Sequence, residues 1–213
     1  MDEHKTVHDL PERLRLGTRD LHRLAERSGL MARMLAGRID VAAYAALLRN
    51  LHALYAALEA ALRAAQAHAA VARLPLAALW REPALAADLA VLLGPRWPDG
   101  PPCCAATRDY AERLQALASD RPAMLLAHAY LRYLGDLHGG QILQRQLQQC
   151  LGAGTPTSFY DFGPPGEVAA LRAQFRAALA AAPVSEDEAE ALVEEARWGF
   201  RQHQRLFEAL ASA

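Results

Sequence analysis

Apolar residues recur along most of this chain at the three- and four-residue spacing of an α-helix. One such stripe consists of leucines alone, at Leu47, Leu51, Leu54, Leu58 and Leu62. β-branched residues are scarce, and no Asn-Gly pair marks a β-hairpin. The pattern therefore predicts an all-α fold: a compact bundle of about seven or eight helices.

Helix boundaries can be placed from capping residues and prolines. Asp40 is a suitable N-cap for the leucine-striped helix. Pro83 suits the first turn of a helix that continues to Leu93. Ser185 and Glu188 have the spacing of a capping box, which predicts the start of the last helix. The apolar stripe of that helix consists of Val193, Ala196, Phe200, His203, Phe207 and Leu210.

A second long helix is expected from Pro122 to about Cys150, and its interior contains Gly135, Gly139 and Gly140. The residues from 152 to 166, rich in Gly, Pro, Ser and Thr, form the longest connection expected. Each glycine inside a helix costs about 1 kcal/mol relative to alanine, so these three residues need another explanation.

Two explanations for the glycines stay open on this segment. A flat ligand can lie on the bare helix backbone, next to the charged groups Arg132 and Asp136, which share that side of the helix. Alternatively, the glycines allow another helix to cross closely, and the segment taken alone favours this second explanation.

Length and composition bound the protein class. With 213 residues, of which 53% are hydrophobic and 22% charged, the chain fits a single domain over residues 1–213, with 1–9 as a flexible N-terminal segment. A formal net charge of -1 gives no electrostatic reason to expect nucleic acid or an anionic membrane as partner.

Cysteine usage and hydropathy indicate a compartment. The three cysteines are odd in number and lack the spacing of metal ligands, so neither a disulfide framework nor a zinc site is expected. The N-terminus lacks the apolar core of a signal peptide, and no uninterrupted apolar run approaches the ~18 residues of a spanning helix. We expect a cytoplasmic protein without a membrane anchor.

One histidine has a neighbour that suits a metal ligand. Glu26 follows His22 by four residues on a predicted helix, and such a carboxylate can accept the Nδ1 proton and leave Nε2 free for a metal. The same pair is also an ordinary contact on a helix surface. The chain has no HExxH motif, no Gly-rich phosphate loop and no Gly-x-Ser-x-Gly elbow, which disfavours hydrolases and nucleotide-binding enzymes.

Two segments together resemble a known family. Residues 14–22, followed by Ala25 and Glu26, resemble the proximal helix of haem oxygenases, and residues 130–141 resemble their distal helix. Further matches occur in the same order and spacing at 54–59, 94–97, 128–130 and 206–208. The resemblance extends from about Leu14 to Leu210.

This resemblance implies a haem held between a proximal helix and a kinked, glycine-rich distal helix. His22 would be the axial ligand of the haem iron, with Glu26 beside it, and Gly135, Gly139 and Gly140 would let the distal helix lie close over the porphyrin. Asp136 would hold in place the water molecule that serves the oxygen bound to the iron. The resemblance assigns three further residues to its polar network: Arg132, Tyr55 and Tyr110.

The resemblance also implies how haem is oriented. The propionates would be anchored by Arg15, Tyr130, Arg172 and Arg176, while Phe200 and Phe207 would form pocket wall. On sequence alone the arginines fit solvated surface and the phenylalanines fit core. His138 and His203 stand where animal enzymes carry serine and asparagine, which puts the details of the proton relay in doubt.

The implied activity is oxidative cleavage of haem, both substrate and cofactor, to biliverdin, carbon monoxide and ferrous iron. It would use O2 and electrons from a reductase or ferredoxin. Two other functions stay open: a haem carrier or sensor with the same fold and no turnover, and an enzyme on the same scaffold acting on a thiamine-like or quinone-like substrate. The presence of both His22 and Asp136 argues against a haem carrier or sensor. The presence of His22 together with the glycine-bearing helix argues against an enzyme for a thiamine-like or quinone-like substrate.

Overall fold

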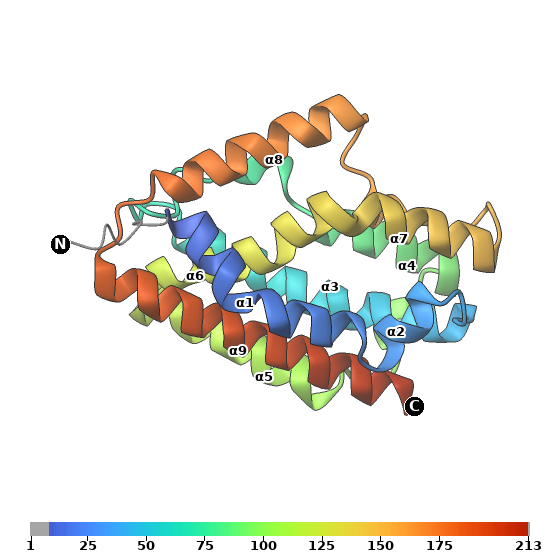
Figure 1. The fold of residues 1–213 in the computed structure, drawn as a ribbon. Helices are drawn as coiled ribbons and strands as arrows, with labels where there is room; N and C mark the ends of the chain where they lie inside the picture. Colours follow the sequence, from blue (N-terminus) through green and yellow to red (C-terminus); the bar gives the residue numbers. More distant parts are fainter. Residues whose placement is uncertain (1–8, 213) are drawn as a thin grey trace.

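The computed structural model describes residues 9–212, which fold into helices joined by loops and short 3-10 turns (Figure 1). This part of the chain contains nine α-helices, one more than the upper expectation. Their bounds are α1 (Leu10–Glu26), α2 (Gly29–Leu35), α3 (Val41–Ala64), α4 (Glu82–Leu93), α5 (Ala105–Asp120), α6 (Leu125–Ala129), α7 (Gly135–Leu151), α8 (Pro165–Ala180) and α9 (Glu186–Ala211).

Helix α3 forms the centre of the bundle, because its leucine stripe is buried and it packs against α4, α5 and α6. Helices α1 and α9 lie side by side along the molecule, and α8 lies at the upper edge in Figure 1. By length and composition, α3 could also cross a membrane, but one such helix is weak evidence, and half of its most apolar window is buried.

The predicted helix starts are confirmed. Asp40 accepts the Ala43 N–H at 2.8 Å, and Ser185 and Glu188 form both bonds of a capping box. Pro83 lies in the first turn of α4. Asp9, which the sequence assigned to a flexible segment, caps α1 by accepting the Glu12 N–H at 3.0 Å; residues 1–8 of that segment lie outside the described residues.

The glycine-bearing segment departs from the expected single helix. It begins with a 3-10 turn at Pro122–Met124, continues as α6, passes through a π-helical turn at Tyr130–Leu134 and ends as α7. A π turn inserts an extra residue into the helical repeat, so it offsets and bends the helix just before Gly135. The connection over residues 65–81 is longer than the one over 152–164, contrary to expectation.

Candidate active site

Two adjoining hollows lie between α1, α7 and α9. We call them the inner hollow, about 210 Å³, and the outer hollow, about 510 Å³. The residues that line both are His22, Glu26, Leu131, Gly135, Gly139 and Phe200. The proximal and distal segments of the sequence thus face the same space.

The two hollows differ in chemistry. The inner hollow is walled by apolar side chains, among them Met31, Leu35, Leu47, Leu51, Ile142, Leu143, Phe159 and Phe207. Besides His22 and Glu26, its polar groups are Arg132, Asp136, His203 and Tyr160. The outer hollow is rimmed by cations and polar groups: Arg15, Arg19, Arg23, Arg176, Tyr130, Thr18 and His138. One cavity therefore combines an apolar interior with a cationic mouth.

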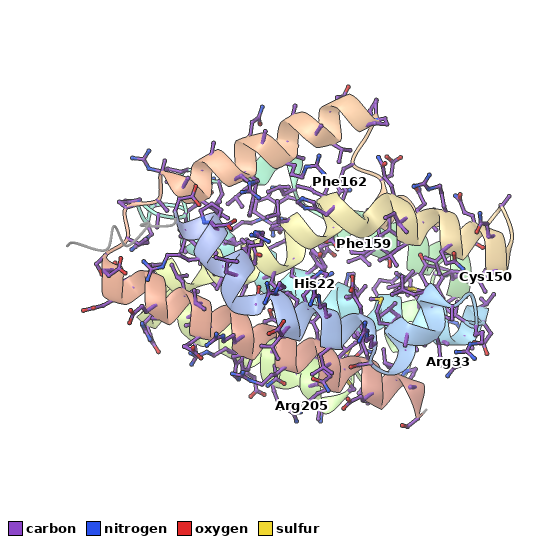
Figure 2. All side chains as sticks on the ribbon, in the orientation of Figure 1. His22, Arg33, Cys150, Phe159, Phe162 and Arg205 are labelled. Atoms are coloured by element: carbon purple, nitrogen blue, oxygen red, sulfur yellow. The ribbon has the colours of Figure 1, made fainter. Side chains whose placement is uncertain are left out.

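His22, labelled in Figure 2, lines both hollows and so stands where they adjoin. It follows Leu14 and Thr18, both buried, at four-residue spacing, which places it at the edge of the stripe that packs α1 onto the bundle. The imidazole is 53% exposed, with Nδ1 3.6 Å from the Glu26 carboxylate and its ring 5.7 Å from that of Phe200.

Across the cavity, a buried network holds Asp136. Arg132 donates from Nη2 to Asp136 at 3.2 Å and from Nε to the Tyr55 hydroxyl oxygen at 3.1 Å. The Tyr55 hydroxyl in turn donates to Asp136. The side chains of Asp136 and Arg132 are only 9% and 12% exposed, so bonds that involve their charges fix the carboxylate in a definite place.

Arg132 also determines the protonation of His203. It donates from Nη1 to His203 Nε2 at 2.8 Å, so Nδ1 carries the ring proton and donates to the Gly199 carbonyl at 2.9 Å. Burial and the charge of Arg132 lower the pKa of His203 to about 3. The imidazole therefore stays neutral near neutral pH.

The pKa of Asp136 is raised from its usual range. Burial is the largest cause, and it outweighs the opposing effects of Arg132 and of the hydrogen bond from Tyr55. A carboxyl group of this kind can hold a proton, or share one with a neighbouring donor, more readily than an exposed aspartate.

The glycines separate into two kinds. A Cβ on Gly135 or Gly139 would meet no atom within 4 Å, whereas one on Gly140 would touch Tyr160 at 3.5 Å. Gly135 and Gly139 line both hollows, and Gly140 lines neither of them. A close helix crossing thus does not explain Gly135 and Gly139, whereas Gly140 lies next to Tyr160.

Tyr110 belongs to a different network from the one expected. Its hydroxyl donates to His128 Nδ1 at 2.8 Å, and His128 Nε2 donates to Glu195 at 3.1 Å. Arg113 completes this network with two bonds to Glu195. Tyr110 meets the Asp136 network through its ring, which lies edge-on to that of His203 with centroids 5.4 Å apart.

The expected anchoring residues are only partly brought together. Arg15, Tyr130 and Arg176 line the outer hollow, and Arg15 is paired with Glu12 at 2.6 Å. Arg172 lies one helical turn before Arg176 on α8 but lines neither hollow.

The sequence pattern does not indicate several of the residues that line the cavity. Phe159 and Tyr160 come from a loop with a short 3-10 turn, where no periodicity indicates burial. Leu35 and Ile142 are 41% and 57% exposed, and only their position at the cavity gives them a role.

The fold and this site define an all-helical ligand-binding protein in which the His22 imidazole and bare glycine backbone line the same cavity. The chain belongs to the haem oxygenase family: the family model described as "Heme oxygenase" matches residues 8–209.

Relatives and solved structures agree over nearly the whole chain. The haem oxygenase of Pyropia yezoensis is 34% identical over 97% of this chain and 88% of its own. Heme oxygenase 2 of Synechocystis sp. is 37% identical over 90% of this chain and 79% of its own. The crystal structure of Synechocystis heme oxygenase-1 in complex with heme has a TM-score of 0.89 at 31% identity, covering 96% of this chain and 93% of that one.

Proposed function

We propose that this chain binds haem between His22 and the backbone of Gly135 and Gly139 and cleaves it to biliverdin, carbon monoxide and ferrous iron. The observation that carries the proposal is the cavity itself, where the His22 imidazole lines both hollows together with Gly135 and Gly139, which have open space above them. The apolar interior suits a porphyrin ring, and the cationic mouth suits its propionates.

His22 is proposed as the iron ligand, through Nε2. Its Nδ1 faces Glu26, which favours the tautomer that leaves Nε2 unprotonated. In the described residues, no three His, Cys, Asp or Glu side chains gather to hold a metal. The His22 imidazole would suit a metal whose remaining ligands come from a macrocycle.

The interior network is proposed to manage protons. Haem supplies the iron that activates O2, and its neutral imidazole ligand favours O–O cleavage less than a thiolate would. Asp136 holds or passes a proton through water, because its carboxyl group lines the inner hollow and has a raised pKa. Arg132 and Tyr55 keep that carboxyl group in place, and His203 accepts a bond from Arg132.

The mouth is proposed to orient the substrate. Arg15, Arg176 and Tyr130 line the outer hollow and can bind the two propionates, which would fix the ring edge that is attacked. Phe200 and Phe207 contribute cavity wall. Because cleavage consumes electrons, the protein needs an external donor, which we propose is a reductase or ferredoxin. We place this activity in one cytoplasmic domain formed by residues 1–213.

A visible spectrum recorded during turnover tests this function. Haem added to the purified protein should give the spectrum of a histidine-ligated haem, and ascorbate or a reductase in air should replace it by biliverdin absorption with release of carbon monoxide. A stable haem complex that never yields biliverdin would instead identify a haem carrier or sensor. Failure to bind haem would refute both functions.

A further inference from the structure

The back wall of the inner hollow is formed by residues 158–162, which we call the strap. Phe159 and Tyr160 line the hollow, and Tyr160 also packs against the position of Gly140. Phe159 is fully buried. The strap belongs to a loop, so its position depends on the groups that bind it.

Asp88 on α4 holds the strap with three hydrogen bonds. It accepts the Ser158 N–H at 3.0 Å and the Ser158 hydroxyl at 2.5 Å, both on Oδ1, and the Phe159 N–H at 2.9 Å on Oδ2. Asp88 is only 2% exposed. Buried bonds to a carboxylate are stronger and more specific in geometry than neutral ones, so Asp88 fixes the backbone of Phe159.

Phe159 carries this constraint into the Asp136 network. Its ring lies edge-on against the ring of Tyr55, with centroids 5.3 Å apart at 75°. Tyr55 is fully buried and donates its hydroxyl to Asp136. In a close-packed interior, a shift of one ring forces its neighbour to move. The contacts thus run from Asp88 through Phe159 and Tyr55 to the carboxyl group at the hollow.

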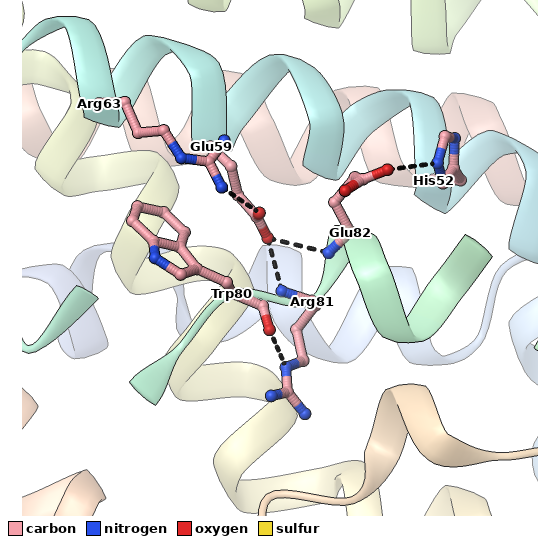
Figure 3. A network of polar contacts seen from close by, with 6 residues as sticks. All are labelled: His52, Glu59, Arg63, Trp80, Arg81 and Glu82. Atoms are coloured by element: carbon pink, nitrogen blue, oxygen red, sulfur yellow. Dashed lines mark hydrogen bonds and ion pairs between the residues drawn. The ribbon is translucent and has the colours of Figure 1, made fainter. Parts of the chain in front are cut away.

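A second set of hydrogen bonds, made by Glu59, joins α3 to the start of α4 (Figure 3). Glu59, four residues after Tyr55 on α3 and fully buried, accepts the N–H groups of Arg81 at 2.6 Å and Glu82 at 3.0 Å at the start of α4. Arg81 in turn donates to the Asp161 carbonyl at 2.7 Å. Helices α3 and α4 and the strap are therefore bonded as one unit behind Asp136.

We propose that Asp88 is a positioning residue of haem cleavage, which acts through Phe159 and Tyr55 to hold the Asp136 carboxyl group in its working orientation. The proposal rests on the proposed function for its catalytic consequence. The positioning of Asp136 by Asp88 does not require haem, so it can be tested in the haem-free protein.

The first test is a carboxyl-carbon NMR titration of Asp136 in haem-free protein. Asparagine at position 88 cannot accept the bonds from both Ser158 and Phe159 as Asp88 does, because its amide nitrogen is a donor and replaces one of the two carboxylate oxygens. Asp88→Asn should loosen Tyr55 and weaken its bond to Asp136, so the pKa of Asp136 should rise by about half a unit or more. The charged groups that act on Asp136 are Arg132 and Arg81, and the substitution replaces neither of them.

Three variants give this titration its controls. Asp40→Asn removes a carboxylate that also accepts a backbone N–H, at the start of α3 and without a bond to the strap, and should leave the Asp136 titration unchanged. Ser158→Ala keeps both backbone bonds to Asp88 and should give a smaller shift than Asp88→Asn. Phe159→Leu keeps those bonds but removes the ring edge on Tyr55, and should reproduce the shift.

The second test uses haem-loaded protein. Asp88→Asn should bind haem within about threefold of the unmodified protein, because no bond to the substrate is lost, yet form biliverdin about five- to tenfold more slowly, a barrier change of about 1 kcal/mol. An unchanged Asp136 titration in Asp88→Asn would overturn the proposal. If that variant does not fold, an unchanged titration in Phe159→Leu would overturn it equally. Failure of haem turnover in the unmodified protein would refute only the proposed function.

Discussion

The mouth and the interior of the cavity are built in different ways. At the mouth, Arg15 and His22 are 52% and 53% exposed, and their acidic partners Glu12 and Glu26 are 28% and 51% exposed. In the interior, Tyr55 is fully buried and Asp136 and Arg132 nearly so, and they bond to one another. Exposed ion pairs hold side chains loosely, whereas buried bonds to charged groups fix them.

This difference assigns a separate task to each region. The interior geometry exists before any ligand arrives, so it is suited to chemistry that needs a fixed proton donor. The mouth gains its final arrangement from the ligand, so it is suited to capture and orientation. Variants at the mouth should therefore alter binding, and variants in the interior should alter the reaction or the stability of the fold.

The largest effect is expected for His22→Ala. Loss of the proposed iron ligand should abolish the histidine-ligated haem spectrum and lower biliverdin formation at least ~100-fold, about 3 kcal/mol in the barrier. Added imidazole should partly restore both by filling the space of the lost side chain. A variant with an unchanged ferrous-CO spectrum and full turnover would show that His22 is not the ligand.

The next largest effect is a change in pH dependence from His203→Asn. Burial and Arg132 lower the pKa of His203 to about 3, whereas the unfolded side chain titrates near 6.5. Below pH 6.5 the unfolded state therefore takes up a proton that the folded state does not, and stability is lost as the pH falls towards 3. Between pH 7 and pH 5, the unmodified protein should lose about 2 kcal/mol more unfolding free energy than the variant. Urea unfolding at both pH values measures this, and equal losses would contradict the assigned neutral His203.

A smaller effect separates two arginines on α8. Arg176→Ala should weaken haem binding about fivefold, because Arg176 lines the outer hollow and can pair with a propionate. Arg172→Ala is the matched control one turn away, and haem titration should give the affinity of the unmodified protein. Equal losses from both changes would mean that net charge, and not position at the mouth, determines haem affinity.

The smallest effect on stability is expected for Gly139→Leu. Because a Cβ there meets open space, leucine should leave the haem-free protein as stable as before or raise its unfolding free energy by up to ~0.8 kcal/mol. Haem affinity should fall, since the side chain enters the hollow. A loss of about 1 to 3 kcal/mol in haem-free unfolding would instead indicate overpacking at a helix crossing.

The sequence predicts the features that depend on interactions between residues close together in the chain. Helix starts at Asp40, Pro83 and Ser185 follow from backbone bonds within one turn, and they are confirmed. The π turn at 130–134 could not be predicted, because its residues continue the helical spacing and its extra residue is accommodated by tertiary packing. The sequence predicts too few helices for the same reason, since its spacing does not separate α6 from α7.

Parts of the site depend on contacts between distant residues, which a single sequence does not record. Tyr110 bonds to His128, and His128 bonds to Glu195, because α5, α6 and α9 meet there, and no spacing in the sequence indicates that meeting. The same holds for Asp88, whose bonds to the strap join residues 70 and 71 positions apart. The glycines of α7 were visible in the sequence, but only the space above Gly139 separates a ligand face from a helix crossing.

The division of tasks between mouth and interior is tested most directly by Asp136→Ala, titrated with haem and then supplied with ascorbate in air. The account predicts a haem affinity within about threefold of the unmodified protein, because Asp136 is not a proposed ligand, and a biliverdin yield lowered at least tenfold, at least about 1.4 kcal/mol. An undiminished biliverdin yield would remove Asp136 from the reaction. A haem affinity that falls as far as the yield would show that the interior serves binding, and the division would be wrong.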